Sequence, residues 1–388
     1  SIKMFTWIKE TVINIKVHLQ EHNLDSAIWL VDTVPARAGF SILKDKIWVP
    51  FWILHVILLV YIYIVGSVKY QMEHAEVAGD FIKGYVNVSL TILTLNNSYW
   101  FVKKRPLLRV VLSMVKQNDE LSRESESLQE KHRKCIAVVK KIVFIFYSLN
   151  AVDAFCIYMP NQINPLNNHY CMIPCVGIQP LSEFPQYQIC LAILIVQHIV
   201  MVIVVLSFQA IILFLIAHTT AMYYLLSEDM VFETEEDLRS TDFVKEKLPV
   251  LIRRHAAILQ TIDRIKALYS MPLGVNFGTN AVCILFFFYI PLQEWVKYSP
   301  VLIFSFLVFF LYCFLCQKLI NASEVFERAV YSCGWEKFKL RDQKLVYVML
   351  MQAQKPILLL AADIIPVNIY TFATTLQAMY RFVTVVKV

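Results

Sequence analysis

Long apolar runs separated by charged segments dominate the hydrophobic and polar pattern of this 388-residue chain. A helix needs about 20 mostly apolar residues to cross the hydrocarbon core of a bilayer. The runs that meet this length predict seven membrane-spanning helices, at 48–68, 81–102, 136–159, 189–217, 271–291, 300–320 and 367–386. They are continuous and do not alternate, unlike the strands of a membrane β-barrel. The pattern therefore predicts an all-α membrane protein.

The distribution of lysine and arginine predicts the orientation of these helices. Basic residues near the ends of spans remain on the cytosolic side. The segment between the second and third spans is rich in Lys and Arg, whereas 160–188, between the third and fourth, contains neither. We therefore expect a cytosolic N-terminus and an extracellular C-terminus, the reverse of a G-protein-coupled receptor. Because the first apolar run begins near Trp48, we expect no cleavable signal peptide.

A charged amphipathic stretch, YSCGWEKFKLRDQKLVYVMLMQAQK, precedes the last apolar run. It is too polar to cross a membrane, and it predicts a cytosolic helix over residues 331–355. Residues spaced by three or four should form the packing stripe of that helix, namely Trp335, Phe338, Leu345 and Met349. A basic amphipathic helix lying on the membrane surface is the alternative interpretation.

Composition supports a membrane protein and narrows its chemistry. Hydrophobic residues make up 58% of the chain and charged residues 17%, and the mean hydropathy is +0.55. The net charge of +6 does not indicate nucleic-acid binding, because the basic residues lie beside the cytosolic ends of the spans, where they face anionic lipid. No phosphate-binding loop, zinc-protease motif or nucleophile elbow occurs. We therefore expect no enzyme activity, no cofactor and no metal site.

Three cysteines lie in or beside the loop that is predicted to face the cell exterior. Cys171 and Cys175 belong to that loop, and Cys190 lies near the start of the fourth span. Oxidising conditions outside the cell permit a disulfide, either between the two loop cysteines or from one of them to Cys190. Free thiols are the alternative, and the sequence leaves the choice open.

Residues 321–386 resemble the C-terminal signature of insect odorant receptors. The matching positions are Ala329, Tyr331, Trp335, the triplet Gln354-Lys355-Pro356, Pro366, and Phe372 followed eight residues later by Tyr380. The sequence departs from the usual pattern at Glu336, where an aromatic residue is common, and at Ala361-Ala362-Asp363, where a glycine is common. The related gustatory receptors resemble it less well, because their Gln-Phe ending is missing.

The resemblance implies a ligand-gated, non-selective cation channel subunit of the plasma membrane, expected in olfactory sensory neurons. In that family four subunits meet through cytosolic helix ends, and the last helix of each lines the pore. The short loop between the fourth and fifth spans resembles odorant-tuned subunits more than the family's coreceptor. The implied partners are the coreceptor in a heterotetramer, a volatile organic ligand, permeant cations and the lipid membrane, with no nucleic acid.

The resemblance also divides the chain into functional regions. Residues 1–47 are expected to form a cytosolic segment, and 48–320 to hold spans one to six with a ligand pocket in their outer half. Residues 321–356 are expected to form the anchor that joins subunits, together with Tyr331 and the packing stripe described above. Residues 357–388 are expected to form the pore-lining helix and its entry.

The family's pocket lies between spans two, three, four and six. The matching positions are Tyr85, Val88, Ser89, Asn150, Asp153, Ala154, Tyr158, Gln197 and Met201. Within each span these residues are three or four apart, so they share a helix face, although ordinary helix packing produces the same spacing. Asp153 is informative because an ionisable group inside a span is costly and marks function, unless it reaches water near Pro160.

Alignment through Phe372 and Tyr380 assigns the pore gate to Val385, with Arg381 one turn earlier on the same face. A ring of aliphatic side chains closes a pore by excluding water. Packing of Val385 against neighbouring helices is the alternative. Because a cation beside a cation gate is unfavourable, either this subunit supplies only part of the ring or Arg381 turns sideways to a partner.

Other classes of membrane protein fit the pattern less well. A gustatory-receptor-like channel is one alternative, and a secondary transporter is another. Transporters commonly consist of two related halves with broken helices, and the chain contains no internal repeat. A G-protein-coupled receptor is opposed by the predicted topology.

Overall fold

The computed structural model describes residues 17–18, 20–37, 39, 41–43, 47–69, 73, 78–123, 128–158, 163–164, 169–170, 175–178, 182–230, 241–288 and 295–386. The helices are α2 (Leu24–Arg37), α3 (Val49–Leu59), the π-helical η1 (Val60–Lys69), α5 (Ala78–Lys103), α6 (Arg105–Arg123), α7 (Gln129–Tyr158), α8 (Gln186–Asp229), α10 (Thr241–Phe287), α11 (Trp295–Tyr331), the short η4 (Trp335–Lys337), α12 (Leu340–Ala353) and α13 (Ile369–Val386). Strands β1 (Ile163–Asn164) and β2 (His169–Tyr170) pair antiparallel, as do β3 (Leu360–Ala361) and β4 (Ile365–Pro366). The predicted all-α fold class is confirmed.

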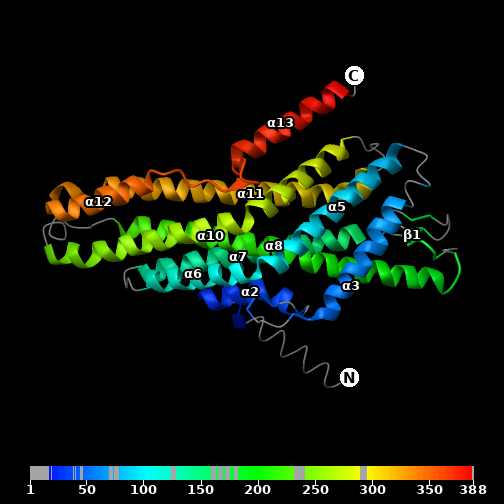
Figure 1. Ribbon diagram of the computed structural model, residues 1–388, viewed down its shortest axis with the longest axis horizontal. Coiled ribbons are helices and arrows are strands. Elements are labelled where there is room, and N and C mark those ends of the chain that lie inside the picture. The colour runs from blue at the N-terminus through cyan, green and yellow to red at the C-terminus, as the bar shows by residue number, and fades with distance from the viewer. Residues whose placement is uncertain are drawn as a thin grey trace, which may run out of the picture.

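The long helices run side by side in one elongated bundle, with α8 among them (Figure 1). Every residue of α8 from Val204 to Tyr223 is buried. A helix that is apolar on all sides must be surrounded by others, and α8 packs against α2, α5, α7, α10 and α11. It is therefore the core of the bundle.

The helices at the centre of the bundle are longer than a membrane crossing requires. The 44 residues of α8, at about 1.5 Å each, extend about 66 Å, roughly twice the hydrocarbon thickness of ~30 Å. Their surplus length continues toward the end of the molecule that carries α12, away from the end that carries β1 (Figure 1). The bundle is therefore much longer than a bilayer is thick, and it extends past the predicted spans on one side.

Each predicted span coincides with one helical stretch: α3 with η1, then α5, α7, α8, α10, α11 and α13. By length and apolar composition alone, four stretches of the described residues qualify as membrane spans: Val49–Lys69, Gln129–Val152, Gln186–Asp229 and Leu302–Lys337. The more polar α5 joins α10 through hydrogen bonds that are partly buried. Its Asn96 amide donates to the Asn276 side chain at 3.0 Å and to the Pro272 carbonyl at 3.2 Å, both on α10.

The helix that is predicted to be cytosolic begins later than expected. We expected one helix over 331–355, but α11 ends at Tyr331, and α12 begins at Leu340. Gly334 lies between them with φ of 77°, a left-handed conformation that glycine adopts without steric cost and that ends a helix. Trp335 was expected in the packing stripe of that helix, but it lies in the short turn η4, before α12 begins.

Candidate functional site

One group of buried apolar side chains stands apart from the main core, and we call it the outer cluster. Its members come from η1 and the end of α3, from α5, from the segment 175–178 and from α8. They are Leu59, Ile62, Tyr63, Leu90, Leu93, Cys175, Cys190, Leu194, Met201 and Val205. The cluster lies toward the end of the bundle that is predicted to face the cell exterior.

A few polar groups enter this apolar surrounding. The Tyr63 hydroxyl donates a hydrogen bond to the Met201 sulfur at 2.9 Å. Gln197 lies beside Tyr63 on the same face of α8 as Met201, but neither polar atom of its amide makes a hydrogen bond of normal geometry within the described residues. A mostly apolar site with a small number of polar groups is the usual composition of a small-molecule site.

Seven of the nine predicted pocket residues fall into three groups. Ser89, Gln197 and Met201 are buried, and Met201 belongs to the outer cluster. Asn150 is also buried, but its amide donates to the Phe146 carbonyl of its own helix at 2.7 Å. The side chains of Asp153, Ala154 and Tyr158 lie outside the described residues.

Tyr85 and Val88 occupy a different environment from the other predicted pocket residues. Both side chains are exposed, Tyr85 by 55%. The Tyr85 ring stacks on Phe286 of α10, with ring centroids 5.1 Å apart. These two residues therefore lie on the exposed side of α5, and Tyr85 reaches the outer cluster only through Phe286, which packs against it.

The first span contributes side chains that sequence reasoning left out. Leu59, Ile62 and Tyr63 form one wall of the outer cluster. The pattern gave one signal, the tyrosines Tyr61 and Tyr63 within a mostly aliphatic run, since a buried tyrosine hydroxyl usually has a partner. Its partner on α8 is 138 residues away in the sequence, so the pairing was not accessible from the pattern.

Apolar grooves also lie on the sides of the bundle, two of them formed entirely by described residues. One, of about 400 Å³, lies between α3, η1 and α5 and includes His55, Ser98 and Lys103. The other, of about 370 Å³, lies between α7, α8 and α11 and includes Lys134 and Lys318. Neither groove includes a predicted ligand residue.

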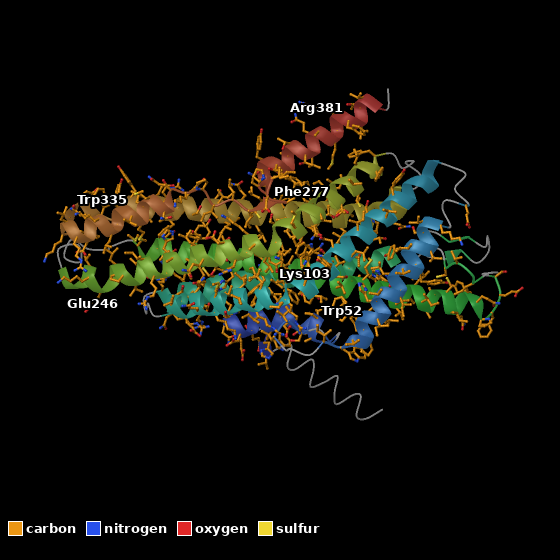
Figure 2. All side chains as sticks on the ribbon, in the orientation of Figure 1. Trp52, Lys103, Glu246, Phe277, Trp335 and Arg381 are labelled. Atoms are coloured by element: carbon orange, nitrogen blue, oxygen red, sulfur yellow. The ribbon has the colours of Figure 1, made fainter. Side chains whose placement is uncertain are left out.

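The last helix, α13, leaves the bundle. Phe372 near its start packs among Phe306, Phe309 and Phe310 of α11, with ring centroids 5.0 to 5.5 Å apart. Leu376 and Met379 extend this contact on the side of α13 that faces the bundle. The rest of the helix projects away from the other helices (Figure 1), and Arg381 lies on the projecting part (Figure 2). Val385 is 77% exposed, and Arg381 makes no ion pair within the part of the chain that is described.

A tight connection holds α13 to the bundle. The turn between β3 and β4 contacts α10, where the Ala362 amide donates to the Ser270 carbonyl at 2.8 Å and the Asp363 amide donates to the Ser270 hydroxyl at 2.8 Å. Ala362 and Asp363 have φ of 53° and 58°, a conformation that is uncommon for residues with a side chain. The entry to the last helix is therefore fixed to the fifth span.

The predicted anchor residues occupy both faces of the α11–α12 region. Phe338 and Met349 are buried, Trp335 is half-buried, and Leu345 and Tyr331 are exposed. The buried stripe of α12 consists of Asp342, Val346, Met349 and Ala353. Its other side presents apolar side chains to the surroundings, which we call the exposed α12 face: Leu340, Leu345, Tyr347, Val348 and Met351.

Charged and polar side chains are paired in the part of the bundle beyond the predicted spans. The Asp119 carboxylate contacts His132 at 2.7 Å and Arg123 at 2.9 Å, and His218 lies 3.7 Å away. Burial raises the pKa of Asp119, but the hydrogen bond with His132 and the nearby His218 ring outweigh it and hold that pKa well below its usual value of 3.8. This carboxylate is therefore charged at cytosolic pH.

His255 lies near these ion pairs in an apolar setting. Its ring packs against Phe326 at 4.6 Å and Tyr223 at 6.3 Å between ring centroids. Burial lowers the pKa of His255 to about 4, because the charged imidazolium is poorly solvated there. This histidine is neutral at cytosolic pH.

One cysteine spacing was missed in the sequence. Cys313 and Cys316 form a Cys-x-x-Cys pair on α11, and both are buried. Among the described residues, no group of three His, Cys, Asp or Glu side chains is arranged to hold a metal ion. The spacing therefore belongs to the packed interior of the helix.

Known proteins with a similar sequence are odorant receptors. The family model described as 7tm Odorant receptor matches residues 78–380. The chain is 28% identical over 161 residues to odorant receptor 67a of Drosophila melanogaster, and 24% identical over 160 residues to odorant receptor 49a of the same species. These matches cover 39% and 40% of this chain, and 37% and 39% of the two relatives.

Solved structures share the fold over nearly the whole chain. The insect olfactory receptor OR5 from Machilis hrabei superposes with a TM-score of 0.69 at 14% identity, covering 99% of this chain and 98% of that one. The same receptor in complex with eugenol gives a TM-score of 0.70. With the family model matched across most of the chain, this protein belongs to the 7tm odorant receptor family.

Proposed function

We propose that this chain is the odorant-tuned subunit of a ligand-gated cation channel that it forms with the family's coreceptor in the plasma membrane. The observation that carries the proposal is the projection of α13 from its own bundle (Figure 1). A membrane helix with exposed side chains on several faces requires neighbours other than its own bundle. A shared pore, to which each subunit contributes one such helix, supplies them.

The two faces of α13 differ in a way that supports this role. Phe372, Met379 and Val383 are turned toward the bundle, since Met379 and Val383 are buried and Phe372 packs on α11. Gln377, Arg381 and Val385 are exposed and four residues apart, so they share one face. We propose this face as the pore wall, with Val385 as part of the gate.

The outer cluster is the proposed ligand site. Volatile ligands are small and mostly apolar, and the cluster offers a buried apolar surrounding with the polar groups of Tyr63, Gln197 and Met201. Ser89 is the further buried residue from the sequence prediction. Tyr85 and Val88 are weaker candidates in this proposal because of their exposure.

The exposed α12 face is the proposed assembly surface. It lies beyond the predicted spans, at the end of the molecule that also holds Trp335 (Figure 2). Tyr347 is 62% exposed, and exposed apolar patches outside the bilayer commonly mark contacts between proteins. Contact between subunits there leaves the outer halves of the bundles free to bind ligand.

Whole-cell currents from cells expressing this chain with and without the coreceptor test the proposal, with surface expression measured in parallel. A volatile panel should evoke current only in the co-expressing cells, and Val385→Ala should alter that current. Val383→Ala, two residues earlier on the bundle side, is the matched control. Odour-evoked current from this chain alone would exclude dependence on a coreceptor, and an unaltered current in Val385→Ala would remove this residue from the gate.

A further inference from the structure

Two cysteines of the outer cluster lie next to each other. Cys175 is in the segment 175–178, which follows β2, and Cys190 is in the first turns of α8. Both are 0% exposed, and their thiol groups are within hydrogen-bonding contact. Of the pairings that the sequence left open, the structure brings together Cys175 and Cys190, whose sulfur atoms are not bonded in it. Cys171 lies outside the described residues.

The position of this pair along the molecule distinguishes it from the other cysteines that the structure describes. Cys135 and Cys333 lie toward the predicted cytosolic side, where thiols stay reduced. Cys283, Cys313 and Cys316 lie within predicted spans. Cys175 and Cys190 lie at the end predicted to face the lumen of the secretory pathway during synthesis, and later the cell exterior.

We propose that Cys175 and Cys190 form a disulfide bond in the mature protein. The bond arises by exchange with the disulfide of an oxidising thiol protein of the secretory pathway. Each cysteine loses its thiol hydrogen, the bond between the two sulfur atoms forms, and the oxidant's disulfide is reduced to two thiols. Atoms and electrons therefore balance without a metal or a further redox group.

The cross-link has a definite structural consequence. The segment 175–178 covers the outer cluster, where the Tyr61 hydroxyl donates to the Val176 carbonyl at 2.8 Å and Ile178 packs against the buried side chains. A bond from Cys175 to Cys190 fastens this segment to α8 on the same helix as Gln197 and Met201. The bond therefore holds the segment 175–178 in place as a fixed part of the proposed ligand site.

Differential alkylation of the purified, membrane-expressed protein tests the bond without any measurement of channel activity. The protein is denatured in detergent with a light maleimide, then reduced and treated with a heavy maleimide, and its peptides are assigned by mass spectrometry. We expect heavy label on Cys175 and Cys190 and light label on Cys283 and Cys313. Light label on Cys175 and Cys190 would show free thiols and overturn the proposal.

Single substitutions identify the pairing. In Cys190→Ser, the thiol of Cys175 should change from heavy to light label, and Cys175→Ser should have the same effect on Cys190. Cys135→Ser is the control and should leave both heavy. If Cys175 keeps its heavy label in Cys190→Ser, it is bonded to another cysteine such as Cys171, and the proposed pairing is wrong.

Discussion

Gly274 of α10 faces Ala362 of the turn between β3 and β4 so closely that no side chain fits between them. A Cβ atom added at Gly274 would lie 2.6 Å from the Ala362 Cβ and 2.7 Å from its amide nitrogen. Ser270, which is one helical turn earlier on α10, accepts the hydrogen bonds from the Ala362 and Asp363 amides. The fifth span and the entry to α13 therefore meet backbone to backbone.

Gly274→Ala should weaken this contact, because the added methyl group forces the turn away from α10. Overpacking of this kind costs about 1–3 kcal/mol, so we expect a lower unfolding temperature for the detergent-purified protein. Gly278→Ala is the matched control, since it is one turn later on the same helix and a Cβ there meets nothing within 4 Å. Equal unfolding temperatures for the two variants would contradict the close contact.

His255 should make stability depend on pH in the weakly acidic range. Its pKa is lowered to about 4 from 6.5, so the unfolded chain binds more protons between these two values. The free energy of unfolding should therefore fall as pH decreases from 6.5 toward 4, by up to about 1.4 kcal/mol per pH unit.

Thermal unfolding of wild type and His255→Phe across that range checks this prediction. Phenylalanine retains the ring contact with Phe326 but does not titrate, so its pH dependence should be shallower. His22→Gln is the control, because His22 is exposed. Parallel curves for wild type and His255→Phe would show that this histidine is not the titrating group.

Tyr63→Phe should reduce sensitivity to ligand if the outer cluster is the binding site. The change removes the hydroxyl that donates to Met201 and leaves the ring in place. A hydrogen bond contributes about 0.5–1.5 kcal/mol net, so we expect the half-maximal concentration to rise about two- to tenfold. Tyr85→Phe, at an exposed position, should leave the dose–response curve unchanged, and the same shift in both variants would argue against the site.

Val348→Ser should weaken assembly with the coreceptor while leaving the fold of the chain intact. Val348 is exposed on α12, so its loss removes apolar area only from a contact between subunits. Burial of such a side chain contributes about 1.5–3 kcal/mol, which corresponds to a decrease of roughly ten- to a hundredfold in affinity. Co-purification with the coreceptor measures the affinity between the subunits. Lys344→Ser on the same helix is the control. Equal recovery of both variants would exclude Val348 from the interface.

Arg381→Gln should increase cation conductance if its side of α13 faces the pore. Removing a positive charge beside the pathway lowers the barrier to cations, whereas Arg381→Lys retains the charge and should conduct like wild type. Single-channel recordings of co-expressing cells distinguish these outcomes. Unchanged conductance in Arg381→Gln would indicate that the side chain faces a partner subunit or lipid.

The sequence was sufficient to predict those elements that a continuous run of apolar side chains defines. Apolar runs such as 189–217 predicted helices at the right places, because an apolar run as long as the bilayer is thick folds as a helix. The family resemblance in residues 321–386 was confirmed by the family model, which covers most of that stretch. The helix predicted over 331–355 was placed correctly only from Leu340 onward, since one glycine, Gly334, ends α11 and starts a turn.

Only the tertiary structure decided which side chains meet. Tyr63 and Met201 are 138 residues apart in the sequence, and spacing along one helix does not tell which neighbour its face contacts. The exposure of Tyr85 and Leu345 follows from the rotation of α5 and α12 in the bundle, which packing sets. The sequence by itself determined where the apolar part of each spanning helix lies, because the membrane constrains each helix separately. It did not determine the full length of α8, α10 and α11, which extend past the predicted spans. The outer cluster, the turn on Ser270 and the projection of α13 required the structure, because they arise from contacts between helices.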